Sequence, residues 1–180
     1  MTHNAMPSDS EYSYPEKTVT DFLHRSYTAV DGLWFVKIEE RQGFDAALEL
    51  DQQVWAIMPK IQARKARELL GEEGDGPEAL ARCFGLKLRS EGHDLDISVE
   101  NGAVRVCVHY CRWLEIMKRS GRDERLAAQI GERICTTEGA VWAREFGGRY
   151  RFSLLQRRCA GDGCCEYLFT PIETAPGEDE

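Results

Sequence analysis

The chain has 180 residues and a formal net charge of −8, with 31 Asp and Glu residues against 23 Lys and Arg residues. This length fits one domain that buries about two-thirds of the surface its unfolded chain exposes, so folding needs no disulfide. The negative charge argues against a nucleic-acid partner, because nucleic-acid binders gain much of their affinity by neutralising phosphates. The one basic stretch, residues 60–67, has the spacing of a solvated helix face.

Both ends of the chain are polar, and we expect residues 1–17 and the acidic residues 173–180 to be flexible tails. The first segment has neither a basic start nor an apolar core, so it does not read as a signal peptide. No apolar run approaches the roughly 18 residues of a membrane span. We therefore expect a cytoplasmic protein without a membrane partner, built as a single domain over residues 18–172.

The first half of this domain shows helical periodicity. Apolar residues at helical spacing predict three helices, over residues 15–30, 31–41 and 44–70. Pro59 either kinks the third of these or begins a new helix. Pro77 fits the first turn of a further helix, on which Cys83 shares the apolar face and is expected to be buried.

After residue 92 the apolar period changes from helical to alternating. Residues 94–100 and 103–111 flank Asn101-Gly102, a strong hairpin signal, and Val104, Val106 and Val108 share one face of the second strand. Two helices and a second hairpin then follow, over residues 112–117, 122–146, 149–158 and 165–171. The predicted fold class is α+β, with N-terminal helices packed on a four-stranded antiparallel sheet made of two hairpins.

Five of the seven cysteines are candidate metal ligands: Cys111, Cys135, Cys159, Cys164 and Cys165. Thiolates are soft ligands for zinc and for iron–sulfur clusters, so we predict that the first three and one of the last two hold such a group. Only one of Cys164 and Cys165 can join, because neighbours on a strand point to opposite faces. The alternatives are that these cysteines are small buried hydrophobes, or that they form a disulfide in an oxidising compartment.

Four other residues are candidates for binding a small molecule: Trp34, Glu39, Trp55 and His109. Helical spacing places both tryptophans on inward faces, where they line either a ligand cavity or a solid core. His109 shares a strand face with Cys107 and Cys111 and could supply a nitrogen ligand, although a half-exposed polar role is the alternative.

Carboxylates are a second group of candidate site residues: Asp31, Glu49 and Asp51 are interleaved with apolar and aromatic residues on segments that are expected to pack together. A carboxyl group held against tryptophan in a dry cavity would have a raised pKa and could act as an acid or a base. The alternative is that these groups face solvent, with Asp51 or Glu39 paired to Arg64 or Arg41.

Two segments of the chain resemble known protein families. The run from Asp31 to Trp55 resembles the signature of an uncharacterised family of cytosolic proteins found largely in anaerobic bacteria and archaea. The run from Cys159 to Phe169 is similar to the closing hairpin of the L-2-amino-thiazoline-4-carboxylate hydrolase-like and 4-vinyl-reductase-like families. Together these resemblances cover most of residues 18–172. They imply helices packed on an antiparallel sheet, as in small-molecule-sensing and trafficking-related ligand domains.

Three classes of function follow. We favour a cysteine-ligated metal or iron–sulfur protein that binds or senses a small molecule. The alternative is a hydrolase-like enzyme in which a thiolate, His109 or a shielded carboxylate carries the chemistry. The third class is an accessory subunit that docks on a larger enzyme through Trp34, Phe35 and Trp55, so that a protein partner or a homodimer is also a candidate.

Overall fold

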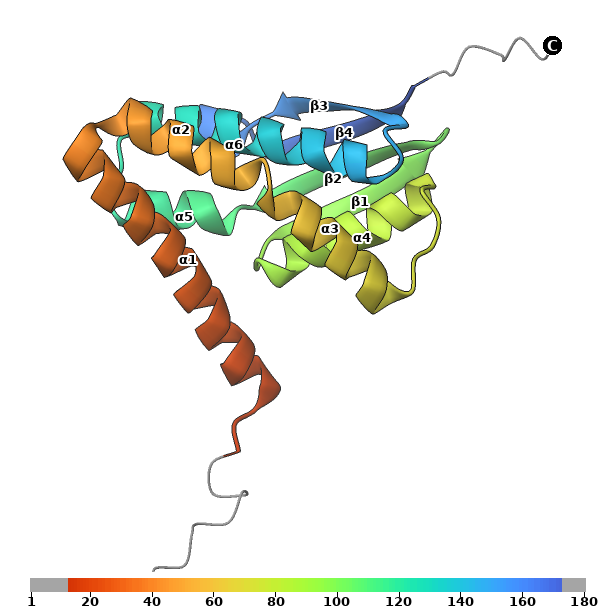
Figure 1. Cartoon of the computed structure of the whole chain (residues 1–180), viewed down its shortest axis with the longest axis horizontal. Coiled ribbons are helices and arrows are strands. Elements are labelled where there is room, and N and C mark those ends of the chain that lie inside the picture. The colour runs from red at the N-terminus through yellow and green to blue at the C-terminus, as the bar shows by residue number, and fades with distance from the viewer. Residues whose placement is uncertain (1–12, 173–180) are drawn as a thin grey trace, which may run out of the picture.

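The computed structural model describes residues 13–172, and Figure 1 shows its helices gathered beside a single sheet. The elements in chain order are α1 (Glu16–Gln42), α2 (Phe44–Trp55), α3 (Met58–Leu70), α4 (Pro77–Ser90), β1 (Asp94–Glu100), β2 (Ala103–Tyr110), α5 (Arg112–Arg119), α6 (Glu124–Glu145), β3 (Tyr150–Gln156), the 3₁₀ helix η2 (Arg158–Ala160) and β4 (Cys165–Pro171). The predicted α+β fold class is confirmed. Of the tails expected at residues 1–17 and 173–180, residues 1–12 and 173–180 lie outside the described residues, and the N-terminal tail is shorter than expected because α1 already begins at Glu16.

The four strands form one antiparallel sheet in the order β1-β2-β4-β3. The two predicted hairpins therefore meet along β2 and β4, where Val106 lies opposite Tyr167. Asn101 and Gly102 have φ angles of 51° and 76°. A two-residue type I′ turn requires positive φ at both positions, which explains why this dipeptide closes the first hairpin.

The two faces of the sheet differ in polarity because side chains alternate along each strand. On the inner face, Val104, Val106 and Val108 are buried as predicted, at no more than 2% exposure. Helices α4 and α6 cover this face. The largest fully buried side chains are Leu80, Phe84 and Leu88 on α4, Trp142 on α6, Phe146 directly after α6 and Phe169 on β4. Gly139 allows α6 to lie close to β3, because a Cβ atom there would clash with the ring of Phe152.

The helix boundaries differ from the prediction near the N-terminus. Residues 16–42 form one continuous helix instead of two, because Gly32 keeps helical geometry in its interior, at a cost of only about 1 kcal/mol relative to alanine. Residues 44–70 form two helices, and Pro59 stands in the first turn of the second, α3, which is one of the two outcomes predicted for this proline. Pro77 likewise opens α4, and Cys83 is fully buried on that helix, so both predictions are confirmed.

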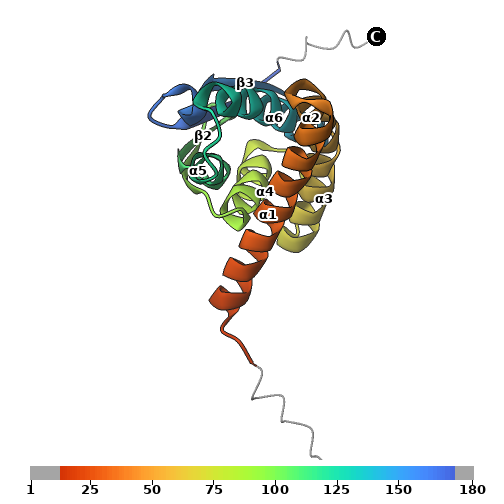
Figure 2. The ribbon, with the colours of Figure 1, turned by 90° about the vertical axis from the view of Figure 1, so that its left-hand side faces the viewer.

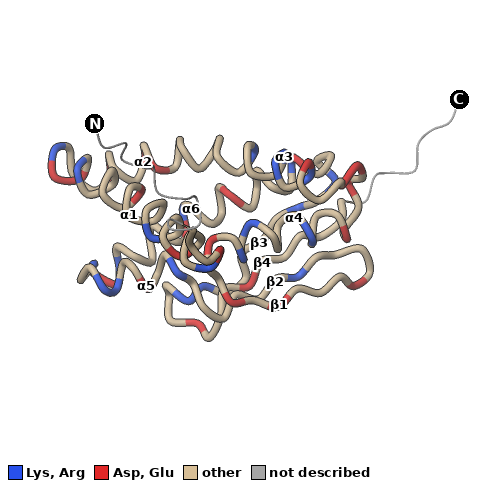
Figure 3. The backbone as a smooth tube through the Cα atoms, turned by 90° about the horizontal axis from the view of Figure 1, so that it is seen from below, with Lys and Arg blue, Asp and Glu red and all other residues tan. Residues whose placement is uncertain are grey.

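Charged residues of both signs are interspersed along the helices and strands (Figure 3). In the basic stretch on α3, Arg64 Nε lies 3.0 Å from Glu145 Oε2 and Lys65 Nζ lies 2.6 Å from Glu68 Oε1. The side chains of Arg64 and Lys65 are 66% and 56% exposed, as expected for a solvated helix face, whereas Arg67 is 20% exposed and pairs with Asp75. Over residues 13–172, no helix combines the length and the apolar character that crossing a membrane requires.

The N-terminal half of α1 extends away from the rest of the chain (Figures 1 and 2). Its C-terminal half packs against α2 and reaches the interior through Thr28 and Phe35, which are buried. This part of α1 forms one wall of a cavity.

Candidate functional site

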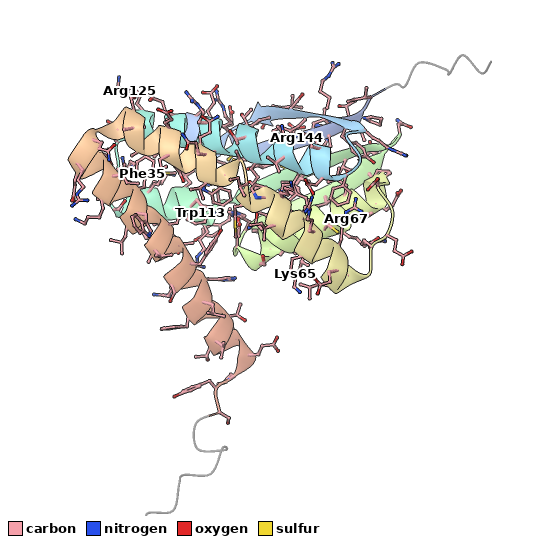
Figure 4. The ribbon with its side chains drawn as sticks, in the orientation of Figure 1. Phe35, Lys65, Arg67, Trp113, Arg125 and Arg144 are labelled. Carbon is pink, nitrogen blue, oxygen red and sulfur yellow. The ribbon has the colours of Figure 1, made fainter. Side chains whose placement is uncertain are left out.

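A cavity of about 450 Å³ lies between the helices and the inner face of the sheet, at the end where β4 begins. Helices α1, α2, α4, α5 and α6 contribute to its wall, together with η2 and β4. Most of the wall is apolar, with Phe35 on α1, Trp55 on α2 and Trp113 on α5; Figure 4 labels the first and the last of these. Leu33 and Ser120 line the cavity and are also exposed, so they mark its rim.

Four of the predicted metal ligands line this cavity: Cys111, Cys135, Cys159 and Cys165. We call these four residues the thiol wall. They come from four parts of the chain, namely the residue after β2, the middle of α6, η2 and the first residue of β4. Residues so distant in sequence thus line one cavity, although the prediction went further and had their sulfur atoms meet at one point.

Cys164, the fifth candidate, lies on the opposite side of the sheet. Its Sγ atom is 2.7 Å from Sγ of Cys107, on the outer face. Cys165 faces inward because it pairs with Val108 on β2, so the strand alternation directs its neighbour outward. Of the two adjacent cysteines, Cys165 is therefore the one that joins the thiol wall.

The thiols of the wall are held in their neutral form. Burial raises the pKa of Cys111 to about 12, raises that of Cys135 well above its usual value, and raises those of Cys159 and Cys165. Hydrogen bonds oppose this effect at each of the four thiols; for example, the backbone N–H of Arg158 donates to Cys165 Sγ at 3.3 Å, and Tyr167 hydrogen-bonds to Cys135. Since the thiolate is the nucleophile and the metal ligand, these groups are poor nucleophiles at neutral pH.

The thiol wall has the donor type and number of a four-thiolate zinc or iron–sulfur site. Over residues 13–172, however, no three Cys, His, Asp or Glu side chains lie close enough together to hold one ion. The chemistry of the donors fits such a group, whereas their arrangement is not a closed coordination shell. The sulfur atoms would have to move toward one another, and release their protons, to bind a metal.

A buried charged network, which the sequence analysis missed, forms another part of the cavity wall. Lys87, Glu91 and Glu138 are each no more than 5% exposed. Lys87 Nζ lies 2.9 Å from Glu91 Oε2 and also pairs with Glu138. Burial opposes the charge on Lys87, but the two carboxylates raise its pKa above the ordinary value. The ammonium group of Lys87 thus pairs with both carboxylates.

The two carboxylates of this network differ. Burial raises the pKa of Glu138, against the attraction of Lys87. Burial has the same effect on Glu91, but there Lys87 and His93 prevail and lower the pKa. The backbone N–H of Arg112 donates to Nδ1 of His93 at 3.2 Å, so the proton is on Nε2, which lies 3.4 Å from Glu91 Oε2. His93 therefore belongs to the network, although its position in a loop gave no indication of this role.

The network has a recognisable sequence signal. Lys87 and Glu91 are four residues apart and continue the apolar stripe of α4 that carries Leu80 and Phe84. Glu138 lies between Ile134 and Val141 on the equivalent stripe of α6. Opposite charges at i and i+4 within an apolar stripe indicate a buried pair, because a lone charge there would lose its hydration without compensation.

Two of the carboxylates identified in the sequence line the cavity and have raised pKa values. Burial, followed by the charge of Glu91, raises the pKa of Asp31 to about 6. Burial, followed by the charge of Asp31, raises that of Asp51 to about 7, although Asp51 accepts a hydrogen bond from Trp55. Asp51 is therefore a shielded carboxyl group beside tryptophan, as hypothesised, whereas Asp31 is shielded beside Glu91; whether either acts as an acid or a base stays a prediction.

Glu39 reaches the cavity through an arginine. Its carboxylate accepts two hydrogen bonds from Arg122, at 2.6 and 3.0 Å, and Arg122 lines the cavity. The predicted pairing of Glu39 or Asp51 with Arg41 or Arg64 is wrong, since Arg64 pairs with Glu145 instead.

His109 shares the outer face of the sheet with Cys107, as the alternation predicted, but Cys111 turns into the cavity after β2 has ended. His109 Nε2 lies 2.9 Å from Asp96 Oδ2 and the side chain is 46% exposed, which is the half-exposed polar role given as the alternative. Trp34, in contrast, does not face inward. Trp34 is 67% exposed, while its neighbour Phe35 is 8% exposed and Trp55 is 5% exposed. The proposed docking face of these three residues is therefore wrong, because two of them are buried. Trp34 instead belongs to an exposed apolar stripe of α1 that also contains Val19, Phe22, Leu23, Val30 and Leu33.

Residues 17–170 match a protein family of unknown function, DUF6125. The chain belongs to this family. The DUF6125 match runs from the first turn of α1 into β4, so every residue of the cavity wall lies within it. No curated protein and no solved structure matches the chain.

Proposed function

We propose that this protein binds a small, mostly apolar molecule in the cavity beside the thiol wall. The observation that carries the proposal is the cavity itself, with its volume of about 450 Å³, its apolar walls and its few converging polar groups. Sites for small molecules in proteins have this size and this composition. The carboxyl pair Asp31 and Asp51 and the four thiols supply the groups that would orient the ligand.

The volume of the cavity supports the proposal that a molecule occupies it. Unfilled apolar volume costs about 24 cal/mol per Å³, so 450 Å³ corresponds to at most ~11 kcal/mol. The total stability of a domain is only about 5–15 kcal/mol. This cost is an upper limit because the rim is open to solvent, but it shows that an apolar ligand would gain substantial free energy from contact with the wall.

The proposal extends to a zinc ion or an iron–sulfur cluster on the thiol wall, as the cysteine pattern suggests. Cys111, Cys135, Cys159 and Cys165 would hold the group; a zinc ion would fix the wall, and a cluster would add redox sensitivity. The specific support is that four soft donors from four segments line one cavity. Metal analysis of anaerobically purified protein tests this extension. Cys135→Ser should release the metal, and Cys83→Ala, in the core, should retain it.

Binding of an apolar fluorescent probe tests the main proposal. Ile134 lines the cavity, so Ile134→Trp fills part of it, whereas Ile61→Trp adds the same bulk at a position that is 57% exposed. We expect the probe to bind to the wild type and to Ile61→Trp with similar affinity, and to Ile134→Trp at least tenfold more weakly. Equal binding to all three proteins would contradict the proposal.

A hydrolase-like activity is the second candidate, and the carboxyl pair favours it. With pKa values of about 6 and 7, Asp31 and Asp51 can exchange protons near neutral pH. The wall thiols are held protonated, so a carboxylate would activate the attacking water. The resemblance of residues 159–169 suggests L-2-amino-thiazoline-4-carboxylate as the substrate, whose ring opening releases a thiol. Thiol release that is lost in Asp51→Asn and kept in Glu49→Gln would support this candidate, and no release by the wild type would exclude this substrate.

A further inference from the structure

A pair of cysteines on the outer face of the sheet takes no part in the cavity. Cys107 lies in β2 and faces outward, opposite Glu166 on β4. Cys164 is two residues before Glu166, so it stands on the same face, diagonally across the two strands. The two Sγ atoms are 2.7 Å apart.

We propose that Cys107 and Cys164 are a redox site that forms a reversible disulfide with a low-molecular-weight disulfide as the oxidant. A covalent S–S bond is about 2.05 Å long, so the sulfur atoms need to approach by only about 0.6 Å. Both residues are partly exposed, whereas Cys83 is fully buried and Cys165 is 6% exposed. Cys111, Cys135 and Cys159 are also partly exposed, but they line the cavity and not the outer face of the sheet. The outer pair is therefore the one that combines a partner within reach with access to a dissolved reagent.

The reaction consists of two thiol–disulfide exchanges. Cys164 lies in the turn before β4, whereas Cys107 lies within β2, so we assign the first attack to Cys164. The Cys164 thiolate attacks the small disulfide RSSR, which forms a mixed disulfide and releases one RS⁻ that takes up a proton. Cys107 then loses its proton and attacks Cys164 Sγ, which closes the protein disulfide and expels the second RS⁻. In total, two protein thiols are oxidised and one RSSR is reduced to two RSH.

The outer pair is close to the thiol wall through the backbone. Cys164 immediately precedes Cys165, and Cys107 precedes Cys111 on the segment that runs from β2 into the cavity. A disulfide between Cys107 and Cys164 would therefore fasten together the two segments that carry Cys111 and Cys165. The proposal does not depend on what the cavity binds, because it rests on the contact at the outer face.

Oxidation with glutathione disulfide tests the proposal on the full chain. After equilibration, quenching and unfolding, the wild type should present five titratable thiols instead of its seven. Trypsin leaves Cys107 and Cys111 in one peptide, residues 106–112, and Cys159, Cys164 and Cys165 in another, so fragmentation spectra must assign the linked positions. We expect a link between Cys107 and Cys164, and its loss on treatment with a dithiol reductant.

Four serine variants separate the outer pair from its neighbours in the same peptides. Cys107→Ser and Cys164→Ser should abolish the link, whereas Cys111→Ser and Cys165→Ser should retain it. A disulfide that still joins the two tryptic peptides in Cys107→Ser or Cys164→Ser would overturn the proposal. So would a wild type that keeps all seven thiols, or one that stops at a mixed disulfide with glutathione. The fragment assignment in the wild type decides the question even if a variant fails to fold.

Discussion

Replacing Lys87 by methionine should destabilise the protein strongly. Methionine keeps the length and the apolar body of the side chain but removes the ammonium group. Glu91 and Glu138, each 4% exposed, would then share a buried site without the cation that pairs with both. Removing one partner of a buried ion pair costs about 3–5 kcal/mol, because the remaining charge is left uncompensated. That is a large share of the roughly 5–15 kcal/mol that stabilises a domain.

The surface provides a matched control. Lys65, labelled in Figure 4, forms an ion pair with Glu68 at 2.6 Å in which the side chains are 56% and 68% exposed. Such exposed pairs contribute about 0–1 kcal/mol, so Lys65→Met should leave the free energy of unfolding nearly unchanged. Urea unfolding followed by tryptophan fluorescence and circular dichroism measures both variants.

The pH dependence gives the same prediction a second test. In Lys87→Met, burial without a cation raises the folded-state pKa of Glu91 and Glu138 above the unfolded-state value. The folded protein then binds the protons more tightly, so the variant should recover stability as the pH falls from neutral toward about 4.5. A variant within about 1 kcal/mol of Lys65→Met at pH 7, or one that shows no recovery in acid, would refute the argument that the ammonium group stabilises the two carboxylates.

Two further predictions follow from the cavity and the core. The folded-state pKa values of Asp31 and Asp51, about 6 and 7, lie above the ordinary aspartate value of 3.8, so the wild type should lose stability as the pH rises from about 4 to about 7. The double variant Asp31→Asn, Asp51→Asn should flatten this part of the profile, and an unchanged slope would contradict the assigned burial. Val106→Asp should cost several kcal/mol, on the order of 3–5, because it places an unpaired charge at a fully buried position. Val30→Asp, at a position that is 51% exposed on α1, is the control, and similar thermal stabilities of the two variants would argue against the inner face.

The sheet could be predicted from the sequence because its signals are local. Asn101-Gly102 meets the backbone requirement of a type I′ turn, and the valines at 104, 106 and 108 alternate with polar residues, which fixes the inner face. The same alternation separated Cys164 from Cys165. It did not show which of them faces the cavity, because that depends on the pairing of β4 with β2.

The errors at α1 and α4 have physical reasons. Helix α1 carries apolar residues on two sides, so spacing alone could not decide that Phe35 faces inward and Trp34 faces solvent. Lys87 is stable inside the protein because of Glu138, a residue on a helix remote in sequence, and no local pattern contains both partners. The sequence pattern selected the four cysteines that line the cavity, and the i, i+4 spacing of Lys87 and Glu91 is a local signal of a buried pair. Only the tertiary structure adds Glu138 and His93 to that pair.

Native mass spectrometry of the anaerobically purified protein tests the central claim most directly, because it reports what the cavity holds when the chain is isolated. We predict that the intact wild type is heavier than its denatured chain by the mass of one bound molecule or metal group. This additional mass should be retained in Ile61→Trp and lost in Ile134→Trp. Identical native and denatured masses for the wild type, together with no binding of added apolar probe, would contradict the claim that this cavity is a binding site.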